Sequence, residues 1–342
     1  MQNKNFRKKK SKVSSPRELI KGIFAGNKIA LSKAITLCES SRKEDRKDAN
    51  QILNACLSRS GEGIRIGISG VPGVGKSTFI ESFGNYLIDQ GKKVAVLAVD
   101  PSSEKSKGSI LGDKTRMELL SRKEDAYIRP TATGGALGGV ALNSKESIIL
   151  CEAAGFEVIL IETVGVGKSE TGERQMCDFF LLLMLAGAGD ELQGIKRGIM
   201  EMADGLVINK ADGENVDAAK KAKRNYQNAL HLFPPNASQW TPEVASCSAL
   251  KNKNMEGVWQ MVSSHEELLK QNGYWVKQRE EQNQKWFAKS IRSLVELRLF
   301  ADQSNAQLYQ EMEKRVIKGE LAAYEAAEKL LPHLLDALQA RR

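Results

Sequence analysis

The 342-residue sequence contains only three histidines and five cysteines, and both residue types are dispersed along the chain. No C-x-x-C pair occurs, so the sequence gives no indication of a dedicated site for a soft metal ion. Scattered thiols without a secretory leader favour a reducing compartment. We therefore expect a cytoplasmic protein whose cysteines and histidines fill core or surface positions.

Long apolar runs are equally scarce. No segment approaches the ~20 consecutive apolar residues that a membrane-spanning helix requires. The apolar run at residues 179–185 has the length of a buried strand instead. We therefore expect no membrane span.

Acidic residues are missing from the N-terminal end. Residues 1–12 carry six lysines and arginines and no acidic residue, within a formal net charge of +9 for the whole chain. The rest of the chain therefore carries +3, the difference between nine and six, which does not indicate a basic face for nucleic acid. We expect residues 1–15 to form a basic disordered arm and the protein to bind no nucleic acid.

The most informative positive feature is a G-x-x-x-x-G-K-[ST] motif at residues 70–77. Glycines in such a loop let backbone N–H groups approach a polyphosphate, the lysine reaches the β- and γ-phosphates, and the serine hydroxyl is placed to bind Mg²⁺. A segment of alternating apolar residues, typical of a strand, precedes the motif, and apolar residues at helical spacing follow it. A strand before the loop and a helix after it are the context that a phosphate-binding loop requires. The predicted phosphate-binding residues are Gly73, Val74, Gly75, Lys76, Ser77 and Thr78.

A second motif, N-K-x-D at residues 209–212, indicates which base is bound. Guanine offers its N1–H and 2-amino group as adjacent donors to a carboxylate, and adenine lacks the 2-amino group. The asparagine is predicted to brace the loop, the lysine stem to lie over the base, and three backbone N–H groups after a short strand at 244–247 to bind guanine O6. These residues are Asn209, Lys210, Asp212, Ser248, Ala249 and Leu250. The sequence therefore predicts GTP and GDP, rather than ATP, as ligands.

Acidic residues stand where a magnesium–phosphate centre would need them. Mg²⁺ prefers oxygen ligands and keeps several waters, so carboxylates serve directly or through a water. Asp100 or Asp113 is predicted to orient the attacking water, and the N–H of Gly165 to contact the γ-phosphate. For each acidic residue the alternative is a helix cap or a solvated turn. The predicted metal-binding residues are Ser77, Asp100, Asp113 and Glu162.

Continuous apolar segments alternate with helical ones between residues 64 and 250. Strands without polar alternation are covered on both faces, so we expect an α/β fold with a mainly parallel sheet flanked by helices, as in P-loop NTPases. Two glycine-rich segments, 134–139 and 186–190, suit loops that change with the γ-phosphate, although ordinary turns are the alternative. The strand candidates are residues 64–68, 94–99, 156–161, 179–185 and 205–208.

Helical additions are predicted at both ends. Residues 16–60 show three short apolar faces, the last of which includes Leu57, with a charged connector at 40–48. The C-terminal part carries amphipathic faces, one of them at Phe287, Ile291 and Leu294. Such an arm suits self-association, or packing on its own domain. The predicted domains are a helical extension at 16–60, a GTPase domain at 61–272 and a helical dimerisation arm at 273–342.

The motifs together resemble the MeaB/ArgK family of GTPases. The matching segments follow the family's order, and the sequence G-A-G-D-E-L-Q-G-I-K at 187–196 is highly family-specific. They are residues 70–78, 99–103, 108–117, 134–139, 162–170, 187–198 and 209–213.

The resemblance implies a homodimeric GTPase that acts as a chaperone for an adenosylcobalamin-dependent acyl-CoA mutase, typically methylmalonyl-CoA mutase, in cofactor loading and protection. It also implies that Lys196 stabilises the negative charge of the phosphates. Members of the family usually have a glutamine at the position where this chain has Lys168. A kinase of an arginine/ornithine transport system and a metal-insertion GTPase are the alternatives. The predicted catalytic residues are Lys76, Asp100, Asp113, Glu162 and Lys196.

Overall fold

The computed structural model describes residues 14–40, 42–100, 117–132, 139–162, 174–187, 197–234, 236–300 and 303–339. The chain divides into two compact units, Met1–Arg279 and Glu280–Arg342. The first unit holds the sheet and the predicted nucleotide-binding motifs, and the second unit is helical. The domain boundaries expected from the sequence stay predictions.

Three helices open the first unit: α1 (Pro16–Phe24), α2 (Lys28–Glu39) and α3 (Lys43–Cys56). A capping box starts α1, because the Ser15 hydroxyl accepts from the Glu18 N–H while the Glu18 carboxylate accepts from the Ser15 N–H. Helix α3 begins inside the connector expected at 40–48, and its first turn carries two acidic residues that favour a helix start. Leu57 is 53% exposed, because it lies in the 3₁₀ turn η1 (Leu57–Arg59) rather than on the apolar face of α3.

Seven strands in the described part of the chain form one parallel sheet in the order β3-β2-β4-β1-β5-β6-β7. Strand β1 lies at the centre, where Ile66 pairs with Leu160 of β4 and with Phe179 of β5. The predicted α/β fold with a parallel sheet is therefore confirmed. The strands are β1 (Ile64–Gly70), β2 (Val94–Asp100), β3 (Ala126–Ala132), β4 (Val158–Glu162), β5 (Phe179–Leu185), β6 (Gly205–Asn209) and β7 (Glu243–Ser246).

Strand β3 is not among the apolar runs that predict strands, because Arg129 and Pro130 interrupt its sequence. It lies at the edge of the sheet, a position that tolerates a proline because one side of the strand has no hydrogen-bond partner. The strands expected at 156–161 and 244–247 are displaced by one or two residues in the structure.

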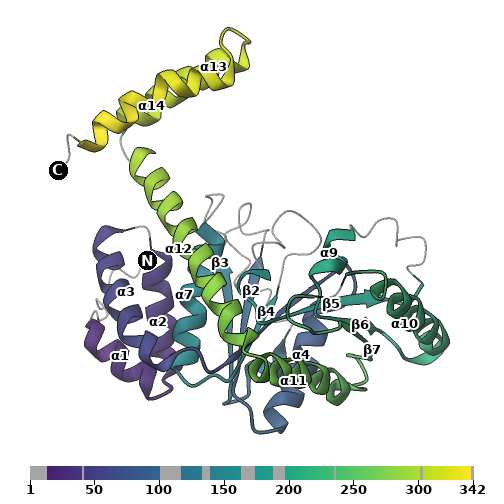
Figure 1. Cartoon of the computed structure of the whole chain (residues 1–342). Coiled ribbons are helices and arrows are strands. Elements are labelled where there is room, and N and C mark those ends of the chain that lie inside the picture. Colours follow the sequence, from purple (N-terminus) through teal and green to yellow (C-terminus); the bar gives the residue numbers. More distant parts are fainter. Residues whose placement is uncertain are drawn as a thin grey trace, which may run out of the picture. The chain divides into compact units, whose positions relative to one another are not determined.

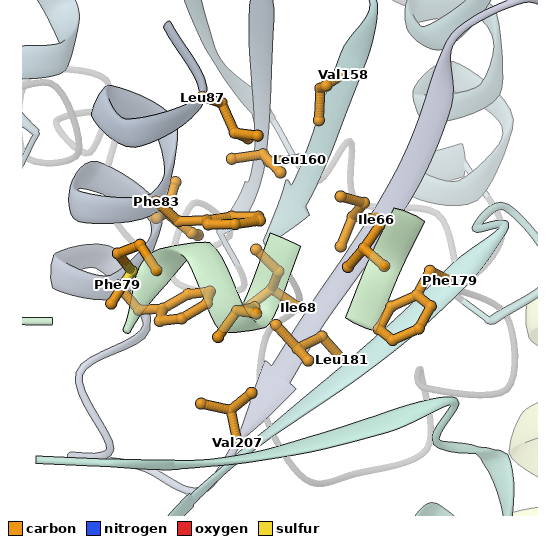
Figure 2. Packing of buried hydrophobic residues seen from close by; sticks show 14 of the residues in the cluster. Ile66, Ile68, Phe79, Phe83, Leu87, Val158, Leu160, Phe179, Leu181 and Val207 are labelled. Carbon is orange, nitrogen blue, oxygen red and sulfur yellow. The ribbon is translucent and has the colours of Figure 1, made fainter. Parts of the chain in front are cut away.

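One face of the sheet is covered by α4 (Lys76–Asp89), α6 (Glu118–Ser121) and α11 (Met255–Gln271). Figure 2 shows Phe79, Phe83 and Leu87 of α4 packed against side chains from the strands, and the first two rings stack with centroids 5.4 Å apart. This packing fixes α4, whose first turn carries the last two residues of the phosphate-binding motif. The strand residues labelled in that view are Ile66, Ile68, Val158, Leu160, Phe179, Leu181 and Val207.

The opposite face is covered by α7 (Gly139–Ala153), α9 (Arg197–Met202) and α10 (Val216–Leu230). Helices α1, α2 and α3 lie beside α7 (Figure 1) and share one apolar cluster with it. Alternate residues of a strand point to opposite faces, so burial on both sides explains why the strands read as continuous apolar runs.

Helix α12 (Tyr274–Phe300) begins in the first unit, and the second unit continues with α13 (Gln303–Ile317) and α14 (Ala323–Gln339). The apolar face expected on this segment is exposed in the structure: Phe287 is 66% exposed, and Ile291 and Leu294 are about half exposed. Self-association through this face stays a prediction. No helix within the described ranges is long and apolar enough to cross a bilayer.

Candidate nucleotide-binding site

The loop between β1 and α4 has, at each end, a glycine in a backbone conformation that other residues rarely adopt. A Cβ atom on Gly70 would lie 2.6 Å from the backbone oxygen of Leu183, which is closer than any side chain tolerates. Gly75 precedes α4 in the left-handed conformation, with φ of 90°. These two residues turn the chain sharply from the central strand into the helix, so the N-terminus of α4 faces the loop.

Lys76 and Ser77 form the first turn of α4, and their side chains return to the loop and to the neighbouring strand. The Lys76 ammonium group donates to the backbone oxygen of Gly70 over 2.9 Å. The Ser77 hydroxyl donates to Oε1 of Glu162 over 3.2 Å. Glu162 is the last residue of β4, which pairs with β1. The structure therefore places the hydroxyl of Ser77, which follows Lys76 in the first turn of α4, against the carboxylate at the end of β4.

The pairing of Ser77 with Glu162 fits the donor set that a small divalent cation takes. Both side chains supply oxygen atoms, and oxygen is the ligand that Mg²⁺ prefers. Thr78 follows in the same turn of α4, and Asp100 is the last residue of β2, at the same edge of the sheet. Asp113, Gly165, Lys168 and Lys196 lie outside the described residues.

Asn209, the last residue of β6, joins the loop at 70–77 to the segment after β7. Its side-chain amide donates to the backbone oxygen of Val74 over 2.9 Å. Its carbonyl oxygen accepts from the backbone N–H of Ala249 over 3.1 Å and from the thiol of Cys247 at 3.5 Å. Asn209 is 2% exposed. A single buried side chain thus connects three segments that are far apart in the sequence.

Lys210 is the first residue after β6 and follows Asn209 directly. Its backbone is left-handed, with φ of 59°, and its ammonium group donates to the backbone oxygen of Gly73 over 2.8 Å. A non-glycine residue in this conformation is uncommon and recurs at functional positions. Its stem is therefore held next to the loop that follows β1.

Asp212 and Ser248 meet through their side chains, because the Ser248 hydroxyl donates to Oδ2 of Asp212. The backbone supports this contact: the N–H of Ala211 donates to the backbone oxygen of Cys247 over 2.9 Å. The same hydroxyl accepts from the N–H of Lys251 over 3.2 Å. The hydroxyl of Ser248 therefore orients the carboxylate, a role that sequence reasoning did not assign.

The amide groups at 248–250 have partners that the sequence did not reveal. The Ser248 N–H donates to the backbone oxygen of Lys253 over 3.2 Å, and the Ala249 N–H donates to Asn209. Leu250 is 73% exposed. Burial raises the pKa of the Cys247 thiol to about 12, so this cysteine stays protonated beside Asn209. The expected contacts of these amides with guanine O6 stay a prediction.

Both sequence motifs thus converge on one edge of the sheet. The loop at 70–77 contacts the residues at 209–210 directly, while Asp212 and Ser248 pair beside them. A cradle of backbone N–H groups with a lysine suits a polyphosphate, and a carboxylate held in place by a hydroxyl suits a base that offers donors. The roles expected for the individual residues stay predictions.

Comparisons with known proteins agree with this arrangement. A family model described as "Methylmalonyl Co-A mutase-associated GTPase MeaB" matches residues 31–304. A putative GTPase of Caulobacter vibrioides is 48% identical over 90% of this chain and 94% of its own length. The GTPase ArgK of Escherichia coli is 43% identical over 86% of this chain and 89% of its own.

A mouse protein and a protein of known structure are also similar to this chain. The methylmalonic aciduria type A homolog of Mus musculus, a mitochondrial protein, is 42% identical over 92% of this chain and 78% of its own length. The crystal structure of a LAO/AO transport system kinase is similar with a TM-score of 0.74 and 34% identity, covering 95% of this chain and all of that chain.

Proposed function

This chain belongs to the MeaB family of GTPases, and from that premise we propose that its GTP cycle serves an adenosylcobalamin-dependent acyl-CoA mutase, with methylmalonyl-CoA mutase as the client. In this proposal the protein assists cofactor loading and protects the mutase. The name of the matching family supports the client, since it describes a GTPase associated with that mutase. The observation that carries the nucleotide site is the bond from Asn209 to Val74, because it joins both motifs into one site.

In this proposal the loop after β1 holds the phosphates of GTP. Backbone N–H groups at 73–78 and the ammonium group of Lys76 neutralise the negative charge, which increases on the leaving oxygen as the γ-phosphate departs. Lys76 lies in the first turn of α4, where the positive end of the helix dipole adds to its charge. Lys196 adds charge stabilisation on the same side.

The guanine base lies on the other side of the contact made by Asn209. The Asp212 carboxylate accepts from N1–H and from the 2-amino group, and its orientation is set by the hydroxyl of Ser248. A base that lacks these two donors leaves the Asp212 carboxylate unpaired in a closed site, which costs free energy and gives selectivity for guanine. The stem of Lys210 covers the base. The N–H groups of Ser248 and Ala249 already donate to Lys253 and Asn209, so the contact with the O6 atom of the base falls to the N–H of Leu250.

Mg²⁺ is the metal ion that the oxygen donors of this site fit, and Ser77 with Glu162, Asp100 and Asp113 would hold it. The ion supplies neutralisation of phosphate charge when it is bound. The carboxylate of Asp100 or of Asp113 also serves to orient the attacking water, and the N–H of Gly165 contacts the γ-phosphate.

We propose slow intrinsic turnover that the mutase accelerates, as in GTPases that lack an arginine finger of their own. We also propose a homodimer formed through the helical arm, because the side chains of Phe287, Ile291 and Leu294 form an exposed apolar stripe at helical spacing. Light scattering of the purified protein measures the dimer. A Phe287→Lys variant is expected to be monomeric if this stripe is the interface.

The alternative function is a kinase, and it is favoured by the similarity to a solved protein that is named a transport system kinase. The two functions differ in where the γ-phosphate goes. GTP labelled in its γ-phosphate yields free phosphate with a GTPase, and it yields a labelled protein or small molecule with a kinase.

The test of the proposed function is phosphate release from GTP with and without purified methylmalonyl-CoA mutase. The proposal predicts an acceleration that saturates with mutase concentration and that a Lys76→Ala variant lacks. A Lys92→Ala variant is the matched control, since Lys92 pairs with Glu157 on the surface. Unchanged release at saturating mutase, together with no effect of GTP on cofactor loading, would contradict the proposal.

A further inference from the structure

We infer that Ser82 and Asn252 form a positioning pair that sets guanine selectivity from outside the base site. Ser82 lies in the second turn of α4, the helix whose first turn holds Lys76 and Ser77. Its hydroxyl donates to Oδ1 of Asn252 over 2.6 Å, across 170 positions of sequence. The inference rests on the proposed placement of guanine at Asp212.

Asn252 lies within a closed turn that follows β7. Ser248 and Lys253 form an isolated antiparallel bridge, with N–H to oxygen distances of 3.2 and 2.9 Å. Between them the N–H of Asn252 donates to the backbone oxygen of Ala249 over 3.3 Å. These bonds close the segment 248–253 on itself, so the position of Asn252 is coupled to the position of the rest of the turn.

The backbone of this turn is left-handed at Asn252, with φ of 51°, and the next left-handed residue is Asn254, with φ of 60°. Asparagine tolerates this conformation better than most residues. Asn254 is tied to the end of β7, because its amide donates to the backbone oxygen of Ser246 over 2.8 Å. The side chain of Asn252 instead contacts α4 through Ser82.

The turn carries two residues of the proposed base site. Its first residue, Ser248, orients the carboxylate of Asp212, and its second, Ala249, donates to Asn209. Ser82 is 6% exposed, so its hydroxyl is held by the packing around α4 rather than by water. The hydrogen bond to Asn252 therefore links the helix on the phosphate side to the turn on the base side of the site. Neither partner of this bond is among the residues expected to touch the nucleotide.

The test compares the dissociation constants of GDP and of inosine diphosphate, which lacks the 2-amino group that Asp212 accepts from. Their ratio measures the contact with Asp212, and a purely structural loss of stability does not change it. Ser82→Ala and Asn252→Gly are each expected to reduce the ratio by about 3- to 10-fold, the range of one neutral hydrogen bond. Glycine keeps the left-handed backbone at 252, so that variant removes only the side chain.

Coupling and controls complete the experiment. The double variant is expected to lose no more than either single variant, because both remove the same bond. Asn252→Asp keeps an acceptor for the hydroxyl and is expected to retain the wild-type ratio. Asn85→Ala is the matched control on α4, since the Asn85 amide bonds to the backbone of its own helix at Glu81. It is expected to leave the ratio unchanged.

Two results would overturn the inference, and they are distinguishable. If the wild-type protein prefers GDP and the ratio is unchanged in Ser82→Ala and Asn252→Gly, the pair has no role in selectivity and the proposed site stands. If the wild-type protein does not prefer GDP to inosine diphosphate, the placement of guanine at Asp212 fails, and the inference fails with it.

Discussion

The side chain of Asn209 donates to the backbone oxygen of Val74 over 2.9 Å, so the end of β6 is bonded to the loop that follows β1. The same side chain accepts from Ala249, and the neighbouring Lys210 donates to Gly73. Phosphate-binding and base-binding segments thus share one hydrogen-bond network. A change at the centre of this network is expected to alter binding of the whole nucleotide rather than of one part.

Replacing Asn209 tests that network. Asn209→Ala leaves the oxygen of Val74 and the N–H of Ala249 without their side-chain partner in a buried place, which costs about 1–3 kcal/mol for each unsatisfied group. We expect the dissociation constants of GDP and GTP to rise at least about 10-fold, measured by competition with a fluorescent GDP. Asn215→Ala is the control, since within the described residues the Asn215 side chain makes no cap bond to α10. Equal losses in both variants would contradict the prediction.

Lys76 is expected to contribute more to hydrolysis than to stability. Its ammonium group contacts the backbone of Gly70 at the edge of the loop, where it would face the phosphates. Lys76→Ala removes a charge that stabilises the departing phosphate, and we expect kcat for GTP to fall about 10²- to 10³-fold. Single-turnover phosphate release measures this. A variant that retains wild-type kcat would show that Lys76 does not act in the reaction.

Arg279 is expected to stabilise the first unit far from the nucleotide site. Its guanidinium group donates to both carboxylate oxygens of Asp178, at 3.0 and 2.7 Å, and to the backbone oxygens of Gly61 and Gly63. The Asp178 carboxylate is almost fully buried, so removing Arg279 takes away its bidentate partner and leaves the backbone N–H of Arg65 as its remaining donor among these contacts. We expect Arg279→Ala to lower the free energy of unfolding by about 3–5 kcal/mol.

Chemical denaturation measures this loss, and an exposed ion pair provides the control. Lys220 pairs with Asp217 on the surface of α10, where both side chains are exposed. Lys220→Ala is expected to change the free energy of unfolding by less than about 1 kcal/mol. The prediction fails if the two variants are equally stable.

His265 gives the stability of the protein a dependence on pH. Its ring lies edge-on to the rings of Phe179 and Trp240, with centroids 5.0 and 5.1 Å away, and its Nδ1 atom is buried without a hydrogen-bond partner among the described residues. Burial lowers its pKa below the ordinary value of 6.5. The carboxylates of Asp204 and Asp178 oppose that shift, and Arg174 adds to it. The unfolded chain therefore takes up a proton at a higher pH than the folded chain does.

The direction in which the unfolding free energy changes with pH follows from this difference. The stability that neutral His265 contributes is fully present above pH 6.5 and is lost as the pH falls from that value through the folded-state pKa, by at most about 1.4 kcal/mol per pH unit. A His265→Phe variant removes this titration, so its unfolding free energy is expected to fall less between pH 7 and pH 5 than that of the wild type. Parallel pH profiles for both proteins would contradict the prediction.

The sequence predicted the parts of the site that short motifs encode. The motifs at 70–77 and 209–212 state the spacing that phosphate and guanine chemistry requires, and the parallel order of the strands places both at one sheet edge. The apolar runs predicted the central strands for the same reason, since burial on both faces removes polar alternation. Strand β3 was not predicted, because Arg129 and Pro130 interrupt its apolar pattern.

Contacts between single side chains far apart in sequence could not be predicted. Nothing in the spacing of residues relates Ser82 to Asn252, or Arg279 to Asp178, because each pair depends on how separate helices and turns pack. The hydroxyl of Ser248 is an intermediate case. Its motif was visible, but its bond to Asp212 required the two loops to be placed side by side.

The placement of guanine at Asp212 is tested most directly by the dissociation constants of GDP and xanthosine diphosphate, measured on the wild type and on Asp212→Asn. Xanthine presents an acceptor where guanine has its 2-amino donor, so an amide at 212 suits xanthine and a carboxylate suits guanine. We predict that the wild type prefers GDP and that Asp212→Asn reverses the preference, each by at least about 10-fold, as expected for matched and mismatched buried hydrogen bonds. A variant that still prefers GDP as strongly as the wild type would contradict this placement.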